Sequence, residues 1–326
     1  MGPKRPPPPS AKRKTGLPAP ATQKTVRGII WRIRSFATHP RTVCVALFIL
    51  VVFLWSYWRI LYPLSRGMVD DARKRNSISI IHPDTRVVVS LTSFPQRLET
   101  ITDTINSLMK QSRPPTVVVL SIPKEVKRLD GIPQQTVPSI VSELQHTYGK
   151  KLIVQRTEDY GPATKLLGAL LVEPDPNTVI ITVDDDVTYH PDTVLGLVEA
   201  IHRFPGSAPT YKCEYFPWWW FTALGQIHEG PCKGFVNAYK AAAYRAGYFS
   251  NKAVFNHSRA PEGCRIHDDV WISGNLYEVG VRPLVVQPGF DSVVHHRPWT
   301  KLSIHAVPKS ESDFRNPCIK FFNNFA

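Results

Sequence analysis

The sequence predicts an α/β fold in which helices flank a mostly parallel sheet, placed behind one N-terminal transmembrane helix. Three observations carry this prediction. Four apolar strand-like runs alternate with helical segments after residue 84, which is typical of a doubly wound sheet. Polar residues follow the ends of these runs, where such sheets bind ligands. A stretch of 17 residues without charge, 42–58, precedes them all.

The first 41 residues hold ten of the 40 Lys and Arg residues and no Asp or Glu. They are rich in proline and lack a hydrophobic period, which predicts a disordered tail. The rest of the chain carries 30 basic against 26 acidic residues. Because this body is close to neutral, the net charge of +14 does not indicate a nucleic-acid-binding domain.

The apolar run extends to a predicted transmembrane helix over residues 42–62, with aromatic residues at its far end as in an interfacial belt. A cleaved signal peptide fits less well, because the run begins past residue 40 and no small-residue cleavage site follows it. A buried core helix is the remaining alternative. The basic tail predicts a type II orientation, in which residues 1–41 are cytoplasmic, residues 63–84 form a stem, and residues 85–326 form a lumenal domain.

The lumenal domain begins with a buried strand at 86–91 and a helix at 95–111, which Ser93 can cap and Pro95 can start. A second strand at 116–122 precedes a helix at 138–148. A third strand at 151–155 precedes a helix at 162–171, and a fourth at 179–183 precedes a helix at 191–204. After residue 205 the periodic pattern is lost.

The fourth strand runs directly into Asp184, Asp185 and Asp186. Side chains alternate along an extended chain, so Asp184 and Asp186 are expected to point one way and Asp185 the other. Converging carboxylates at a strand end favour a hard divalent cation, which in turn binds substrate phosphates. A solvated turn is the alternative interpretation of such a triplet.

Two further polar segments, 92–97 and 160–165, follow predicted strands and are expected at the same sheet edge. No segment has the spacing of a G-x-G-x-x-G or P-loop motif, which disfavours dinucleotide oxidoreductases and P-loop kinases.

A second acidic pair, Asp268 and Asp269, is predicted at the start of a helix. These residues are candidates for helix capping or for a catalytic base. His295 and His296 are candidate metal ligands. The aromatic run 217–221 is interpreted either as core packing or as a platform for a sugar ring.

The cysteines and one glycosylation sequon agree with a lumenal domain. Cys44 lies in the predicted span, and four cysteines lie beyond it: Cys213, Cys232, Cys264 and Cys318. In an oxidising lumen these four can form two disulfides in three possible pairings. Binding of zinc is the alternative role for these four cysteines, although no C-x-x-C pair supports it. Asn256 begins an N-x-S sequon.

In this order the segments LTSFPQRL, GPATKL, VDDD and HDDVW, followed by a late histidine, resemble the GT-A superfamily of nucleotide-sugar-dependent glycosyltransferases. The basic tail, span, stem and lumenal domain look like the plan of type II Golgi enzymes. The resemblance covers residues 86–300 and does not fix one family. It implies a Rossmann-like GT-A catalytic domain in the Golgi or ER membrane.

The resemblance also implies roles for individual residues. Asp186, with Asp184 directly or through a water, would hold Mn²⁺ or Mg²⁺ against the donor diphosphate, and His296 (or His295) would complete the metal shell. Asp185 would face the ribose or sugar. Asp269 would act as general base on the acceptor hydroxyl in an inverting displacement, and Asp268 would contact donor or acceptor. The nucleotide pocket would be lined by Thr92, Ser93, Phe94 and Arg97, with Lys165 close by.

Three functions compete at this point. A glycosyltransferase would move a sugar from a nucleoside diphosphate to a glycan or glycoconjugate hydroxyl, with a retaining outcome as the alternative to inversion. A metal-dependent phosphoesterase would use the same acids. A membrane-anchored lectin would bind glycans without catalysis. The sequence does not reveal the donor sugar, the acceptor, the linkage or the oligomeric state.

Overall fold

The computed structural model describes residues 40–56, 84–126, 132–133, 137–215, 224–226, 228–297 and 311–325. The chain divides into two compact units, Met1–Arg75 and Asn76–Ala326. In the first unit the structure describes one helix, α2 (Pro40–Ser56), of 17 residues. Across all the described ranges, no helix combines the length and apolar character needed to cross a membrane. The end of the predicted span, most of the tail and nearly all of the stem lie outside the described residues.

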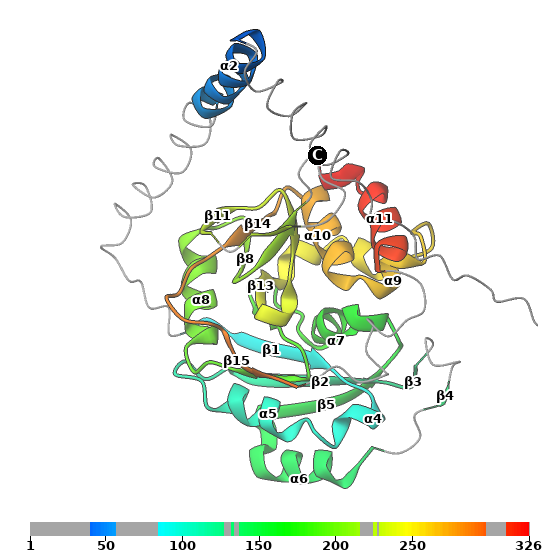
Figure 1. Cartoon of the computed structure of the whole chain (residues 1–326). Coiled ribbons are helices and arrows are strands. Elements are labelled where there is room, and N and C mark those ends of the chain that lie inside the picture. The colour runs from blue at the N-terminus through cyan, green and yellow to red at the C-terminus, as the bar shows by residue number, and fades with distance from the viewer. Residues whose placement is uncertain are drawn as a thin grey trace, which may run out of the picture. The chain divides into compact units, whose positions relative to one another are not determined.

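The second unit contains an eight-stranded sheet in the order β11-β14-β8-β13-β6-β1-β2-β5 (Figure 1). β6, β1, β2 and β5 are parallel neighbours, as are β14 and β8, whereas β13 is antiparallel to both β6 and β8. The strands are β1 (Val87–Thr92), β2 (Val117–Pro123), β5 (Leu152–Thr157), β6 (Val179–Thr182), β8 (Ser207–Thr210), β11 (Gly230–Pro231), β13 (Ala242–Arg245) and β14 (Arg282–Val285).

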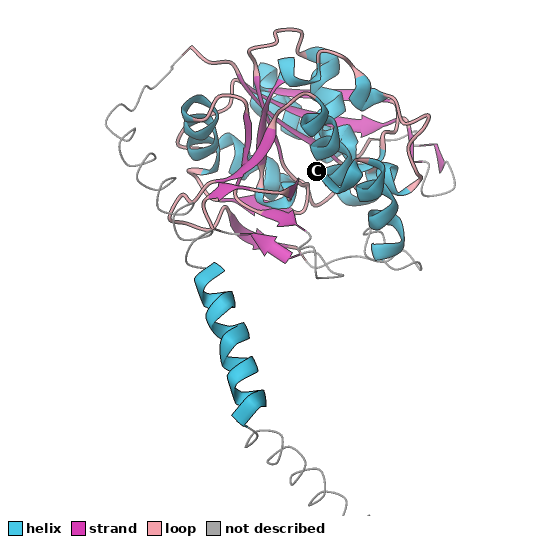
Figure 2. Ribbon diagram, turned by 90° about the horizontal axis from the view of Figure 1, so that it is seen from above, coloured by secondary structure: helices cyan, strands magenta, loops and turns pink. Residues whose placement is uncertain are grey.

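Helices cover both faces of this sheet (Figures 1 and 2). In Figure 1, α7 lies above β1, β2 and β5, while α5 and α6 lie below them. The helices of the unit are α4 (Pro95–Leu98), α5 (Thr102–Met109), α6 (Ser139–Tyr148), α7 (Thr164–Val172), α8 (Thr193–Arg203), α9 (Gly263–Ile266), α10 (Asp268–Glu278) and α11 (Glu311–Phe321). Short 3₁₀ helices occur at Gly149–Lys151, Gly161–Ala163, Ala238–Lys240, Ala246–Phe249, Ala253–Phe255 and Asn323–Phe325.

The alternation of side chains along the central strands gives each face its own apolar core. Val88 and Ile180 pack with α7, α10 and α11 in one cluster. Val89 and Ile181 pack with α5, α6 and α8 in the other. All of these side chains are fully buried, which is why the strands appear in the sequence as continuous apolar runs rather than alternating ones.

Three small sheets complete the unit. β9 (Cys213–Tyr215) pairs with β10 (Leu224–Gln226) and β12 (Gly234–Val236), β15 (Val293–His296) pairs with β7 (Val187–Tyr189), and β3 (Glu125–Val126) pairs with β4 (Ile132–Pro133). Two disulfides, Cys213–Cys232 and Cys264–Cys318, select one of the three predicted pairings. The aromatic run 217–221 lies outside the described residues.

The predicted order of strands and helices is confirmed through residue 204, with ends that differ by one or two residues. The single helix predicted at 95–111 is wrong, because the chain forms two helices, α4 and α5, separated by residues 99–101. Ser93 does not cap the first of them. Phe94 is the N-cap residue and makes no side-chain capping bond, while the Ser93 hydroxyl donates instead to Asp185.

Candidate active site

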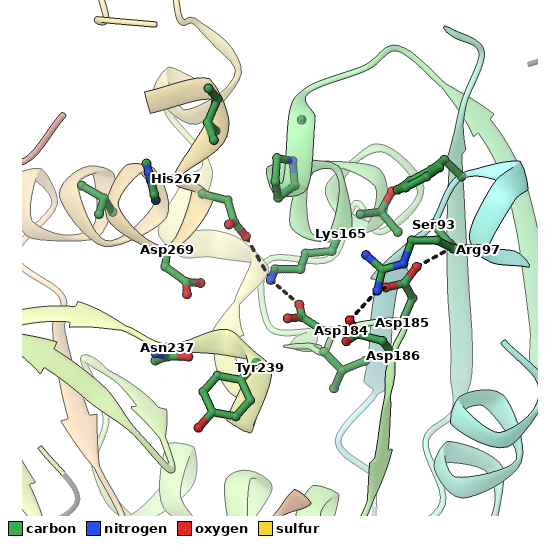
Figure 3. A pocket seen from close by; sticks show the side chains of 18 of the residues that line it. Ser93, Arg97, Lys165, Asp184, Asp185, Asp186, Asn237, Tyr239, His267 and Asp269 are labelled. Atoms are coloured by element: carbon green, nitrogen blue, oxygen red, sulfur yellow. Dashed lines mark hydrogen bonds and ion pairs between the residues drawn. The ribbon is translucent and has the colours of Figure 1, made fainter. Parts of the chain in front are cut away.

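A cavity of about 610 Å³ opens where β1 and β6 end. All eleven residues that the sequence assigned to the site line it: Thr92, Ser93, Phe94, Arg97, Lys165, Asp184, Asp185, Asp186, Asp268, Asp269 and His296. They come from the ends of strands, from helix starts and from β15, segments that are far apart along the chain (Figure 3). The fold therefore brings the predicted constellation into one place. His295, the alternative to His296, is not among the lining residues.

The three consecutive acids do not alternate as an extended strand requires. β6 ends at Thr182 and β7 begins at Val187, so the acids lie in the turn between them. Asp184 turns toward Lys165, whereas Asp185 and Asp186 both turn toward Arg97. The predicted alternation is wrong because the chain has already left the strand before it reaches the first acid.

Arg97 holds two of the three acids. Its Nη2 lies 2.6 Å from Asp185 Oδ1 and 2.5 Å from Asp186 Oδ2. Asp185 also accepts a 2.5 Å hydrogen bond from the Ser93 hydroxyl and is 6% exposed. Burial raises the pKa of Asp185 to about 6, although Arg97 and Ser93 oppose the rise. Asp185 thus contacts residues of β1, α4 and the segment between them, and it also lines the cavity.

The acidic turn, residues 184–186, is held in place by hydrogen bonds between its backbone and other residues. The Tyr189 hydroxyl accepts from the Asp184 N–H at 2.9 Å and donates to the Tyr239 carbonyl at 3.1 Å. The Arg297 N–H donates to the Asp186 carbonyl at 2.9 Å, and its guanidinium donates to the Asp185 carbonyl. Because these bonds use the backbone, they fix the turn while leaving carboxylate oxygens available to the cavity.

Lys165 connects the acidic turn to the second acidic pair. Its Nζ donates to Asp184 Oδ1 at 2.7 Å and lies 3.0 Å from Asp268 Oδ2, an ion pair that lacks hydrogen-bond geometry (Figure 3). Lys165 is 4% exposed. Burial disfavours its charge, but attraction by Asp184, Asp268 and Asp269 outweighs burial and raises the pKa of Lys165 well above its usual value.

Asp268 and Asp269 occupy the first two positions of α10, as predicted. Neither serves as the N-cap, which is His267, and no side-chain capping bond forms there. Instead the Ala238 N–H donates to both carboxylate oxygens of Asp269, at 3.2 and 3.3 Å. Burial and repulsion by Asp268 raise the pKa of Asp269 well above its usual value. A carboxyl group with a raised pKa that faces a cavity suits general acid–base chemistry.

Of the three predicted metal ligands, two lie together. His296 Nε2 is 3.8 Å from Asp186 Oδ1, because β15 pairs His296 with Val187 at the start of β7. Asp184 points to Lys165 instead. Within the ranges that the structure describes, no three His, Cys, Asp or Glu side chains form a group that could hold a metal ion. Asp186 and His296 therefore converge, and the Asp184 side chain, which is one-third exposed, lines the same cavity.

Three residues that were predicted to line a nucleotide pocket, Thr92, Ser93 and Phe94, line the cavity together with Arg97. The Phe94 ring is buried and lies 5.7 Å from the Arg97 guanidinium. The Thr92 hydroxyl donates to the Ser121 carbonyl, so this hydroxyl forms a hydrogen bond between β1 and β2.

Several lining residues were missed from sequence: Glu214, Asn237, Tyr239, Lys240, His267 and Arg315. All six follow residue 205, where no periodic pattern marks strands. His267 had a signal, since it directly precedes the acidic pair, whereas nothing in the sequence sets Glu214 or Arg315 apart.

No protein-family model matches the sequence, and no curated protein matches it. Solved structures do resemble the fold. S. aureus TarS residues 1–349, solved in complex with UDP-GlcNAc, has a TM-score of 0.51 and 13% sequence identity, with 74% of this chain and 66% of that chain covered. The mannosyltransferase PcManGT from Pyrobaculum calidifontis, solved with GDP-Man and Mn²⁺, has a TM-score of 0.47 and 17% identity, with 81% and 70% covered. The chain therefore shares its fold with S. aureus TarS, which agrees with the α/β architecture that its motifs predicted.

Proposed function

We propose that this protein is a nucleotide-sugar-dependent glycosyltransferase that transfers a sugar to a hydroxyl of a glycan or glycoconjugate. One observation carries the proposal: the acidic turn at the end of β6 and the acidic pair that begins α10 face one cavity and are bridged by Lys165. A displacement at a sugar carbon needs one group to stabilise the departing diphosphate and another to accept the proton of the attacking hydroxyl.

The donor side is assigned to the acidic turn and its neighbours. Asp186 and His296, with Asp184, would hold Mn²⁺ or Mg²⁺, which neutralises the charge of the diphosphate as it leaves. Phe94 and Arg97 lie next to the acidic turn, where the nucleotide is expected. Arg97 and Lys165 add two positive charges close to the same point. Because both are paired with carboxylates, the bound metal ion would have to supply the charge that offsets a diphosphate.

The acceptor side is assigned to Asp269. Its carboxylate is oriented by the Ala238 N–H, and among the residues that the structure describes no ion pair holds it, whereas Asp268 contacts Lys165. Asp269 is therefore the better placed of the two to take a proton from the acceptor hydroxyl in an inverting reaction.

We further propose that the enzyme is a type II membrane protein of the Golgi or ER. The charge-free run 42–58 behind a basic tail supports this location, and so do the two disulfides, which persist in an oxidising compartment. Asn256 is exposed and accessible to glycosylation.

The test is turnover of nucleotide sugars by the full-length protein, expressed in the secretory pathway of eukaryotic cells and purified in mild detergent. Release of nucleoside diphosphate from a panel of UDP- and GDP-sugars would be measured with Mn²⁺ and with EDTA. We expect release from at least one donor, lost with EDTA and in Asp186→Ala. Release of inorganic phosphate without sugar transfer would indicate a phosphoesterase. Glycan binding without any turnover would indicate a lectin, and either outcome would overturn the proposal.

A further inference from the structure

A carboxylate outside the two acidic groups also faces the cavity. Glu214 lies in the middle of β9, and its Oε1 accepts a 2.6 Å hydrogen bond from the Asn237 side-chain amide. Lys212 Nζ is 3.7 Å from Oε1, and Arg315 Nη1 is 3.9 Å from Oε2. The side chain of Glu214 keeps 21% of its surface accessible. Glu214 is thus oriented by several partners and still open to a ligand.

Two consecutive residues, Asn237 and Ala238, form hydrogen bonds with Glu214 and Asp269, respectively. The Asn237 side chain donates to Glu214, and the backbone N–H of the next residue, Ala238, donates to Asp269. One short segment therefore positions both carboxylates on the same side of the cavity. In Figure 3 Asn237, Tyr239 and Asp269 lie together, on the other side of Lys165 from Ser93 and Arg97. A ligand group that reaches Asp269 is consequently within reach of the Asn237–Glu214 pair.

Tyr239 adds an aromatic surface to this side. It lines the cavity two residues after Asn237, and the Lys212 and Lys240 ammonium groups lie 5.1 and 5.5 Å from its ring centre. An aromatic ring next to a few oriented polar groups is the usual composition of a small-molecule site. Sugars suit such a site, because their C–H faces are apolar and their hydroxyls donate to carboxylates.

The charges around Glu214 favour a neutral ligand over an anionic one. Lys212 and Arg315 both face the Glu214 carboxylate, and Lys240 pairs with Asp291. Each of these three cations thus already faces a carboxylate, and Glu214 itself repels a negative charge. A phosphate or carboxylate ligand would have to displace these pairs.

Both disulfides brace the same region. Cys213, which is bonded to Cys232, directly precedes Glu214. Cys318, which is bonded to Cys264, lies in α11 one turn after Arg315. The cross-links thus hold the two elements that carry Glu214 and Arg315.

We propose that Glu214, Asn237 and Tyr239 form an acceptor subsite for a neutral sugar ring, in which Glu214 accepts a hydrogen bond from a hydroxyl next to the one that reacts. This inference rests on the proposed function, and it makes Glu214 a specificity-determining residue. The acceptor is accordingly a carbohydrate, rather than a lipid phosphate or an acidic side chain.

The test measures binding of simple glycosides to the full-length protein by saturation-transfer NMR titration. The probes are methyl β-galactoside, methyl β-glucoside, methyl α-mannoside and, as the anion, methyl β-glucuronide, each with UDP or GDP and Mn²⁺ present. We expect at least one neutral glycoside to bind and the glucuronide to bind more weakly. Glu214→Gln should weaken neutral binding by at least about tenfold, because a charge-assisted hydrogen bond is lost. The matched control, Glu199→Gln at an exposed position of α8, should leave binding unchanged.

Tyr239→Leu provides a second variant if Glu214→Gln does not fold, and it should also weaken neutral glycosides. Equal binding by wild type and both variants, no binding of any neutral probe, or preferred binding of the glucuronide would overturn the subsite. Nucleotide binding, followed separately by calorimetry, reports on the donor side. If glycosides bind in a way that depends on Glu214 but no nucleotide binds, the proposed transferase activity would be contradicted and the sugar subsite would be supported.

Discussion

The Nζ atom of Lys165 lies 2.7 Å from Asp184 Oδ1, inside the protein rather than at its surface. This contact joins the start of α7 to the acidic turn after β6. The same ammonium group faces Asp268, so one buried cation compensates carboxylates from two separate parts of the chain. Removing it would leave these acids close together with no cation between them.

Lys165→Met should therefore destabilise the fold strongly. Loss of one partner of a buried ion pair costs up to about 3–5 kcal/mol, because a buried charge such as that of Asp268 stays desolvated; the one-third exposed Asp184 lowers this cost. Lys124→Met is the matched control, since Lys124 pairs with Glu158 at the surface, where both side chains are about 60% exposed. That pair should contribute no more than about 1 kcal/mol. Urea denaturation at pH 7.5 measures both, and equal effects would contradict the role given to Lys165.

Asp269→Asn should abolish transfer while donor binding is retained. General-base catalysis contributes about 10²–10⁴-fold in rate, so kcat should fall by that range with little change in donor Kd. The base works only when ionised. Because the pKa of Asp269 is raised, the rate of the wild-type enzyme should increase with pH, and the midpoint of the increase should lie above the pH at which aspartates usually titrate. Stopped assays from pH 4 to 9 measure this pH–rate profile. If Asp269→Asn kept the same loss of rate at low pH as the wild type, Asp269 would not be the general base.

The two disulfides should differ in what they contribute. They join cysteines 19 and 54 residues apart. Chain entropy predicts about 3 kcal/mol for the shorter loop and about 4 kcal/mol for the longer one. Removing Cys264–Cys318 with paired Ser substitutions should therefore lower the free energy of unfolding more than removing Cys213–Cys232. Denaturation of both double variants, with and without reductant, checks the order, and the reverse order would contradict it.

His257 should make the fold sensitive to acid. It is 5% exposed and stacks on Trp271 with 4.2 Å between ring centroids. Burial, together with Arg265, lowers the pKa of His257 from 6.5 to about 4. The unfolded chain therefore binds a proton near pH 6.5 that the native protein binds only near pH 4, so stability falls as pH drops across this interval. The loss is about 2 kcal/mol once partial solvent screening is allowed for.

His257→Phe should remove this part of the pH dependence, while His146→Gln, at an exposed position of α6, should retain it. Guanidinium denaturation at pH 7 and pH 4.5 measures the difference. A His257→Phe protein that loses as much stability as wild type between these values would show that another group is responsible.

The sequence predicted the first half of the sheet well because its strands are buried on both faces and read as apolar runs. It also singled out eleven residues that line one cavity, since acids and basic residues at strand ends are visible in sequence. Their partners could not be predicted in the same way. The contacts of Arg97 with Asp185 and Asp186 depend on a turn that begins at Val183, and no residue type marks where β6 stops.

The second half of the sheet was missed for a related reason. β8 has the sequence SAPT and β13 the sequence AAYR, and neither resembles an isolated strand. Small residues are favoured there by tertiary packing, which outweighs intrinsic strand propensity. Glu214 was missed because a single acid in an irregular region has no distinguishing spacing, although the disulfide beside it fixes its position.

The insertion of β13 between β6 and β8 also constrains how the chain is made. β6 ends at Thr182, but its antiparallel neighbour does not begin until Ala242, so ribosomes must add about sixty residues before that side of β6 can be paired. During this interval the nascent chain presents an apolar strand edge, which is a template for wrong pairing. The yield of folded protein is therefore expected to depend on chaperones that bind the incomplete domain. Substitutions in β13 should lower the amount of expressed protein before they change its other properties.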